Sequence, residues 1–154
     1  MTDRTKLKSI TEIQNEEVKQ LAREAENFLL SHTWCNQIEN GHLAWAIAGV
    51  IGVFLFDIIP SQPEVDNTLW VITGDLPPAY LVTDDAESWQ KALDGYVYEM
   101  NQWVKAVREG GNLDNIIPVN VEPTIEHAEM LEGRLNFIQE NFINVPSDSI
   151  EGDS

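Results

Sequence analysis

The chain has 154 residues and carries 26 Asp or Glu against 9 Lys or Arg, which gives a formal net charge of −17. A surface potential of this sign repels phosphate groups, so the composition argues against binding to nucleic acid or to an anionic membrane. A hydrophobic content of 43% is enough for the core of one domain. The single cysteine, Cys35, excludes an intramolecular disulfide and fits a reducing compartment, so we expect a cytoplasmic protein.

Positive charge is missing from Glu24 to Gln90, where ten Asp or Glu occur without any Lys or Arg. Two stretches within this interval, Leu43 to Phe56 and Leu69 to Ile72, hold no charge and should be buried. The acids of the interval therefore concentrate at a helix end, in the loops and at the next helix cap.

The N-terminal part of the chain has a helical pattern. Ser9 and Glu12 have the spacing of a capping box, and apolar residues follow at helical intervals. This pattern predicts a first helix from about Ile10 to Ser31. We expect residues 33–41 to form a turn or a short helical piece. Because no apolar core follows the basic start of the chain, we expect no signal peptide.

The uncharged stretch 43–56 resembles a membrane segment only superficially. It is shorter than the ~20 residues that a membrane helix needs, and Asp57 and Pro60 end it. Its second half is rich in Val, Ile and Phe, residues that favour strands. We therefore predict a central strand over 49–59 that is buried on both faces.

A second strand is predicted shortly afterwards. Residues 60–67 have the composition of a turn-forming loop, and residues 68–73 are again rich in β-formers. The two strands should pair as a long-looped antiparallel hairpin. The two prolines of GDLPP, residues 74–78, should then interrupt the ladder because proline donates no hydrogen bond. We expect residues 79–82 to add a short edge strand.

Helical periodicity returns after this edge strand. Thr83, Asp84 and Asp85 offer an N-cap and first-turn acids, and the apolar spacing continues to Gly110 and Gly111. A connector over 112–123 leads to a last helix capped by Thr124. Its predicted apolar face consists of Ile125, Ala128, Leu131, Leu135, Ile138 and Phe142, and its other face carries Glu126, Glu129, Glu132 and Glu140.

The order of these elements is α-β-β-(β)-α-α. It predicts an α+β fold with a small antiparallel sheet of two to three strands, covered by three main helices. We expect a single domain over residues 1–144. Residues 145–154 should form a disordered acidic tail, since few of them have groups to bury.

His32, Cys35 and His42 are the candidates for a metal site, with Glu39 between them. Such nitrogen, sulfur and oxygen ligands can hold zinc, but the paired Cys or His of a second arm are missing, so we expect no metal and no other cofactor. A nucleophilic Cys35 would need an activated thiolate, whereas acidic surroundings raise a thiol pKa. We therefore expect a buried thiol and no catalytic residue. Whether the three side chains converge stays open.

Asp57 and Asp75 are the candidates for a pair of catalytic carboxylates. Each ends a β-rich run, so an antiparallel hairpin would place them at opposite ends. That separation does not suit an acid and base pair, which must lie within about 5–10 Å of each other. Local roles are favoured instead: a hydrogen bond at a strand end for Asp57 and a turn cap after Gly74 for Asp75.

Aromatic residues supply a candidate binding surface. Trp89 and Trp103 are two heptads apart on the apolar face of one predicted helix, which places them in the core. Trp34, Trp70 and Tyr80 are instead candidates for lining a groove beside the two prolines. Partly exposed aromatic residues next to acids suit a protein-binding surface.

The strings LAWAIAGVIGVFLFDIIP and LWVITGDLPPAYL, followed by ALDGYVYEMNQWV and IPVNVEPTIEHAEMLEGRL, resemble a bacterial family of small acidic proteins of unknown function. The resemblance covers most of residues 34–138, and GDLPPAYL is its most distinctive part. It implies a bacterial, stand-alone cytoplasmic domain, and it assigns no catalytic residue.

Together these observations favour a non-catalytic protein-binding module that engages a basic partner, as an immunity protein masks a basic nuclease. The alternative is a small enzyme or ligand-binding protein with a pocket between sheet and helices, built around Asp57, Asp75, Trp70 and Tyr80. We expect a monomer, because like-charged faces oppose self-association. The candidate binding residues are Trp70, Tyr80, a hairpin rim of Glu64, Asp66, Asp75, Asp84 and Asp85, and Glu126 and Glu129 on the last helix.

Overall fold

The computed structural model describes residues 7–83, 86–111 and 122–140. The chain divides into two compact units: Met1–Ala92 together with Gly152–Ser154, and Leu93–Glu151. The expectation of a single domain over residues 1–144 stays a prediction, and the predicted tail over 145–154 lies outside the described residues.

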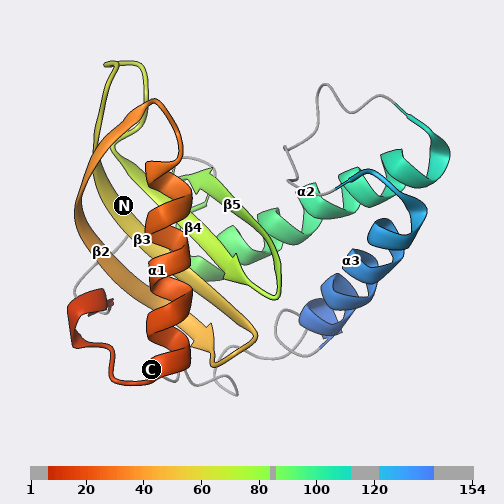
Figure 1. The fold of residues 1–154 in the computed structure, drawn as a ribbon, viewed down its shortest axis with the longest axis horizontal. Helices are drawn as coiled ribbons and strands as arrows, with labels where there is room; N and C mark the ends of the chain where they lie inside the picture. The colour runs from red at the N-terminus through yellow and green to blue at the C-terminus, as the bar shows by residue number, and fades with distance from the viewer. Residues whose placement is uncertain (1–6, 84–85, 112–121, 141–154) are drawn as a thin grey trace. The chain divides into compact units, whose positions relative to one another are not determined.

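The first unit contains a five-stranded antiparallel sheet in which each strand pairs with its sequence neighbours (Figure 1). This finding confirms the α+β class, but the predicted number of two to three strands is wrong. The strands, in order, are β1 (Lys8–Ser9), β2 (Cys35–Ile47), β3 (Ile51–Pro60), β4 (Thr68–Gly74) and β5 (Leu76–Val82).

Strand β2 accounts for most of the difference. Its first half is polar, so the sequence suggested a turn or a short helical piece, but it pairs with the end of β3 from Cys35 opposite Pro60 onward. The uncharged stretch 43–56 is not one element. It is divided between β2 and β3 by a tight turn, in which Val50 N donates to Ile47 O over 2.9 Å and Gly49 has a φ of 74°.

The first α-helix, α1 (Glu16–Leu30), begins later than predicted. Ser9 does cap a helical turn, but that turn is the short 3-10 helix η2 (Ile10–Glu12). The chain then leaves the helical conformation at Ile13, whose side chain is buried. A second N-cap starts α1, because Asn15 Oδ1 accepts hydrogen bonds from the backbone N–H groups of Glu17 and Val18 in the first helical turn.

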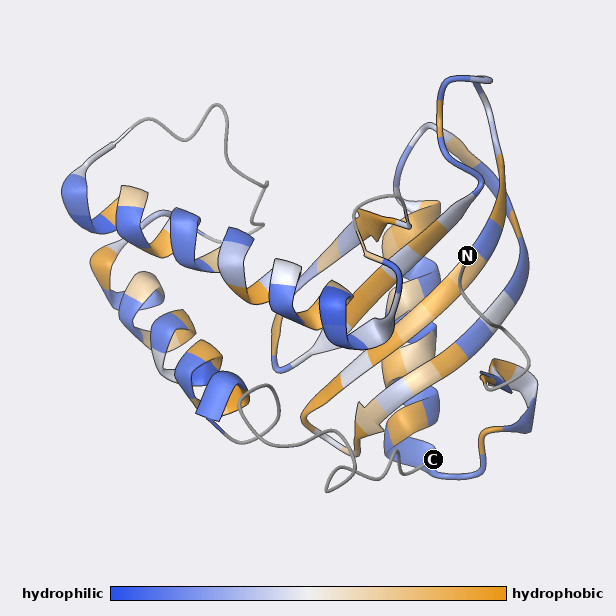
Figure 2. Cartoon of the chain, turned by 180° about the vertical axis from the view of Figure 1, so that it is seen from behind, coloured by the Kyte–Doolittle hydropathy of each residue, from blue (hydrophilic) through white to orange (hydrophobic). Residues whose placement is uncertain are grey.

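Helix α1 packs on one face of the sheet (Figure 1). The middle strands are largely hydrophobic, whereas the helices alternate between hydrophobic and hydrophilic residues (Figure 2). This alternation lets α1 bury one side against the strands and leave the other in water. The core between them includes Val18, Leu21, Ala25 and Leu29 from the helix and Leu43, Phe54, Phe56, Leu69 and Val71 from the strands.

The opposite face of the sheet is also buried, which explains the apolar run in β3. Trp45 is 1% exposed and stacks on Trp89, with ring centroids 4.9 Å apart and planes 3° apart. Trp70 is likewise buried, and its indole N–H donates to Ala86 O over 2.9 Å. The predicted central strand with two buried faces is therefore confirmed.

The predicted hairpin of β3 and β4 is confirmed as well, with Asp57 opposite Thr68 and Ile51 opposite Gly74. The two prolines do not interrupt the ladder, however, since they lie inside β5. Proline is tolerated there because β5 is an edge strand and carries a bulge. In this bulge, Leu76 of β5 pairs with Gly74 of β4, and Ala79 of β5 pairs with Ile72 of β4, so β5 contains one extra residue.

Helix α2 (Trp89–Glu109) crosses from the first unit into the second. It starts later than the predicted cap at Thr83, and Asp84 and Asp85 lie outside the described residues. Its end is confirmed: Gly110, with a φ of 65°, and Gly111 donate to carbonyls of the last helical turn. Trp103, predicted to lie in the core, is buried, and so are the apolar residues spaced three and four apart before and after it, Leu93, Tyr96, Met100 and Val104.

In the second unit, α3 (Ile125–Ile138) starts at its predicted cap, where the Thr124 hydroxyl accepts from His127 N. The predicted apolar face is buried at Ala128, Leu131, Leu135 and Ile138, but Ile125 is 57% exposed. Ile125 is the first residue of the helix and lies off that face. Phe142 and the connector over 112–121 are outside the described ranges. An ion pair of 2.7 Å joins Arg108 on α2 to Glu132 on α3.

Among the helices within the described ranges, none has the length and apolarity required to span a bilayer.

Candidate functional site

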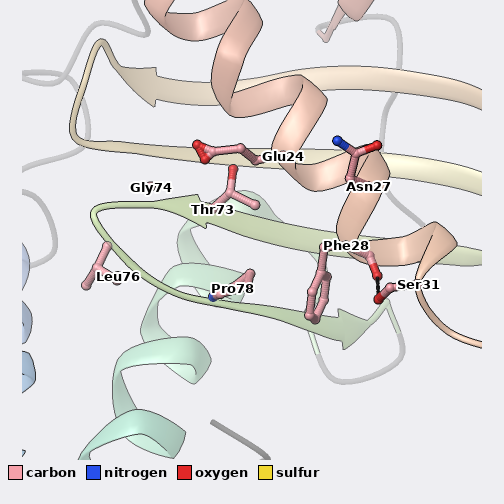
Figure 3. A pocket seen from close by; sticks show the side chains of 8 residues that line it. All are labelled: Glu24, Asn27, Phe28, Ser31, Thr73, Gly74, Leu76 and Pro78. Atoms are coloured by element: carbon pink, nitrogen blue, oxygen red, sulfur yellow. Dashed lines mark hydrogen bonds between the residues drawn. The ribbon is translucent and has the colours of Figure 1, made fainter. Parts of the chain in front are cut away.

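A groove lies between the last two turns of α1 and the hairpin of β4 and β5 (Figure 3). Its volume is about 370 Å³, near the lower limit of about 300 Å³ for small-molecule pockets. The lining residues are Glu24, Asn27, Phe28 and Ser31 from α1, and Thr73, Gly74, Leu76 and Pro78 from the hairpin.

Helix α1 supplies the polar side of the groove. Glu24, Asn27 and Ser31 are three and four residues apart, so they follow one another along one face of the helix. Figure 3 shows the Glu24 carboxylate and the Asn27 amide along this side. The Ser31 hydroxyl donates to Phe28 O over 2.6 Å. Glu24, Asn27 and Ser31 are not among the predicted site residues, although their helical spacing beside Phe28 is visible in the sequence.

The hairpin supplies most of the apolar side. Leu76 and Pro78 line it together with Phe28 of the helix, and all three are half-buried. Thr73 forms the base: it is 2% exposed, and its hydroxyl donates to Leu21 O over 2.8 Å. This bond ties β4 to α1 directly beneath the groove.

Gly74 sets the turn that brings Leu76 and Pro78 back toward α1. Its φ of 149° lies in a region that residues with a side chain rarely adopt. A Cβ atom here would collide with the carbonyl oxygen of Val50 and lie 2.7 Å from the Cα of Ile51. The following amide, that of Asp75, donates to Val50 O over 2.8 Å, which holds the turn against β3.

An aromatic cluster of His32, Trp34 and Tyr80 packs around Phe28, one of the groove residues. The imidazole of His32 lies 4.6 Å from the Trp34 ring, 4.8 Å from the Phe28 ring and 5.4 Å from the Tyr80 ring, measured between centroids. Trp34 and Tyr80 meet edge to face at 5.1 Å. His32 Nδ1 lies 2.8 Å from Phe28 O. Mutual packing of these half-buried rings stabilises the junction of α1, β2 and β5.

The structure therefore brings together Trp34 and Tyr80, two of the three aromatic residues predicted to line a groove, but it separates Trp70 from them. Tyr80 is paired with Val71, whose side chain is in the core beneath α1. Trp70, the residue before Val71, points to the opposite face of the sheet, where it is 1% exposed. It offers no surface to a partner.

Asp57 and Asp75 lie at opposite ends of the hairpin, as expected from an antiparallel pairing. Asp57 is opposite Thr68, and Asp75 follows Gly74 at the other end of β4, roughly 20 Å away along the strand. The predicted local role of Asp57 is confirmed, since its Oδ1 accepts from the Thr68 hydroxyl over 3.0 Å. Asp57, Asp75, Trp70 and Tyr80 thus line no common pocket.

The predicted acidic rim is also divided. Glu64 and Asp66 are exposed in the loop between β3 and β4, whereas Asp75 is exposed in the turn at the far end of β4. Asp84 and Asp85 lie outside the described residues. Glu126 and Glu129 are exposed on α3, which belongs to the second unit.

His32, Cys35 and His42 do not converge. His32 is part of the aromatic cluster, Cys35 is buried at the start of β2, and His42 lies opposite Leu55, roughly 20 Å along the same strand from Cys35. Within residues 7–83, 86–111 and 122–140, no three His, Cys, Asp or Glu side chains are placed to hold a metal ion. Burial raises the pKa of the Cys35 thiol, and a hydrogen bond from the Gln37 backbone opposes that rise.

Comparisons of the chain with protein-family models, with curated proteins and with solved structures found no match. The resemblance to a bacterial family of small acidic proteins stays a prediction.

Proposed function

We propose that this chain is a non-catalytic protein-binding module of the bacterial cytoplasm, acting as a monomer on a basic protein partner as an immunity protein does. One observation carries the proposal: residues 24–90 contain ten acids and no Lys or Arg. The uncharged parts of this interval are largely buried in the sheet, except at the turn of Ala48 and Gly49, while Glu39, Glu64, Asp66 and Asp75 are exposed. Its surface charge is thus negative, with no cation from the same interval to offset it.

Such a surface favours a basic partner for two reasons. Opposite potentials accelerate the encounter of two proteins, and they penalise partners of the wrong sign. Exposed acids in loops and turns attract the cations of a partner over distances up to about one Debye length, which is about 8 Å at physiological ionic strength. The same potential disfavours nucleic acid and self-association.

The alternative of an enzyme with a pocket around Asp57, Asp75, Trp70 and Tyr80 loses its support, because these side chains do not converge. The groove beside α1 is lined by other residues. Among the lining residues that the structure describes, its single carboxyl group is accompanied by the hydroxyls of Ser31 and Thr73, and each hydroxyl donates to a backbone carbonyl rather than to a base. This arrangement favours binding over catalysis.

The proposal is tested by capture of binding proteins at low salt from an extract of the organism that encodes the chain. A retained protein is then purified, and its dissociation constant is measured at increasing NaCl concentrations. We expect a basic protein whose affinity falls steeply as the Debye length shortens from about 10 Å at 0.1 M salt to about 3 Å at 1 M. The proposal would be contradicted if no basic protein were retained, or if the measured affinity did not change with salt concentration.

A pair of double variants separates local from overall charge. Glu64→Gln with Asp66→Asn removes two exposed acids from the cation-free interval, and Glu126→Gln with Glu129→Gln removes two exposed acids from α3. Both variants have the same net charge. We expect the first to weaken binding more, because α3 also carries Arg134, a cation of its own.

A further inference from the structure

We propose that the groove between α1 and the β4–β5 hairpin receives the side chain of an arginine presented by the basic partner. The inference rests on the proposed function and adds to it a place and a chemistry of contact.

The charge of the groove favours a cation. Glu24 is the one ionisable side chain among its lining residues, and it forms no ion pair with any residue of the described ranges. The neighbouring Arg23 keeps its charge, but its guanidinium donates to Gln20 Oε1 over 3.2 Å and does not pair with Glu24. The groove also follows the carboxyl-terminal turns of α1, where the helix dipole adds negative potential.

The hydrogen-bonding groups of the groove favour a donor. The Ser31 and Thr73 hydroxyls both commit their protons to backbone carbonyls, so each offers only lone pairs to an occupant. Glu24 adds two carboxylate oxygens, and Asn27 adds an amide oxygen one turn further along α1. A phosphate or a carboxylate, which only accepts, would find one side-chain donor among the lining residues, the NH2 group of Asn27, and would be repelled by the Glu24 carboxylate. A guanidinium, which carries five N–H groups and no acceptor, matches this set.

The apolar side favours the long stem of arginine. Phe28, Leu76 and Pro78 offer half-buried apolar surface opposite the polar side of α1. The methylene groups of an arginine can pack on such a surface while its charged end reaches the acceptors. The planar, weakly hydrated guanidinium can stack on the Phe28 ring while its fixed fork of N–H groups donates to two acceptors. The ammonium of lysine can also donate to acceptors, but it is a compact and strongly hydrated point charge, so it fits this surface less well.

The inference is tested with a fluorescein-labelled peptide of alternating arginine and glycine, and with matched peptides that carry lysine or the neutral isostere citrulline. Fluorescence anisotropy gives the dissociation constants. Glu24→Gln is compared with Glu26→Gln, a control on the same helix that changes net charge equally but does not line the groove. We expect Glu24→Gln to weaken binding of the arginine peptide about tenfold and Glu26→Gln to weaken it less than about twofold.

We also expect the arginine peptide to bind more tightly than the lysine peptide, and to shift the amide resonances of Asn27, Ser31 and Gly74. Equal losses of affinity in the two variants, or equal binding of the arginine and lysine peptides, would overturn the inference. If both peptides still bound in a salt-dependent manner, the proposed function would stand. Binding of the citrulline peptide as tight as that of the arginine peptide would overturn both.

Discussion

The substitution Thr73→Val tests the bond that ties β4 to α1 under the groove. Valine keeps the branched shape of threonine but cannot donate to Leu21 O, which lies 2.8 Å from the Thr73 hydroxyl. The Leu21 carbonyl is inside α1 and keeps its helical hydrogen bond, so it is not left without a partner. The loss should therefore be that of one buried hydrogen bond, about 1 kcal/mol. That corresponds to about a fivefold fall in the ratio of folded to unfolded molecules.

Urea unfolding followed by tryptophan fluorescence measures this loss, because four of the five tryptophans belong to the unit of residues 1–92. With an m-value of about 2 kcal/mol per M, the midpoint should fall by about 0.5 M. Thr33→Val, at an exposed turn position, is the control and should change stability by less than about 0.5 kcal/mol. A Thr73→Val variant as stable as the parent chain, or a control that loses as much, would refute the reasoning.

Three further substitutions test other parts of the structure. Gly74→Ala should destabilise the first unit by about 3 kcal/mol or more in urea unfolding, because its positive φ is strained for alanine and the Cβ would lie 2.7 Å from the Ile51 Cα; a loss below about 1 kcal/mol would contradict the turn geometry. Trp70→Phe should cost about 1–2 kcal/mol through the lost bond to Ala86 O, yet leave binding of the arginine peptide unchanged, since Trp70 is buried. Burial raises the pKa of Tyr96 above its ordinary value, so the folded chain holds this proton more tightly than the unfolded chain. The contribution of Tyr96 to the free energy of unfolding is complete below the unfolded pKa of about 10 and declines above it by up to about 1.4 kcal/mol per pH unit. Tyr96→Phe should remove that decline in stability between pH 9 and pH 11. An unchanged decline would refute the attribution to Tyr96.

Elements with strong local signals were predictable. The spacing of apolar residues in α2 and α3 placed their buried faces, and the residues at their ends, Thr124 and Gly110, act locally through hydrogen bonds to the adjacent turn. The β3–β4 hairpin was predictable for a similar reason, because two β-rich runs flank a loop of turn formers. In each case the signal that marks the element, a cap, a periodicity or a loop of turn formers, is contained in a short stretch of the chain.

Elements whose stability comes from a distant partner were not predictable. The polar half of β2 has no strand signal of its own and is a strand because β3 pairs with it. Pro77 and Pro78 stay within β5 because that strand is at an edge of the sheet. Ser9 has the sequence of a helix cap, but the longer helix starts after Asn15, since Ile13 is buried in an extended conformation.

The candidate site divides in the same way. The sequence by itself determined the sign of the charge and the absence of Lys and Arg from residues 24–90, because these depend on composition alone. Hydropathy also predicted the burial of most of the uncharged stretches, but not the exposed turn at Ala48 and Gly49. Only the tertiary structure decided which side chains meet. The register of β4 against β5 puts Trp70 and Tyr80 on opposite faces, and the packing of α1 on that sheet sets Glu24 across from Leu76 and Pro78. Residues some fifty positions apart become neighbours only when helix and hairpin pack together, and no pattern along the chain specifies that contact.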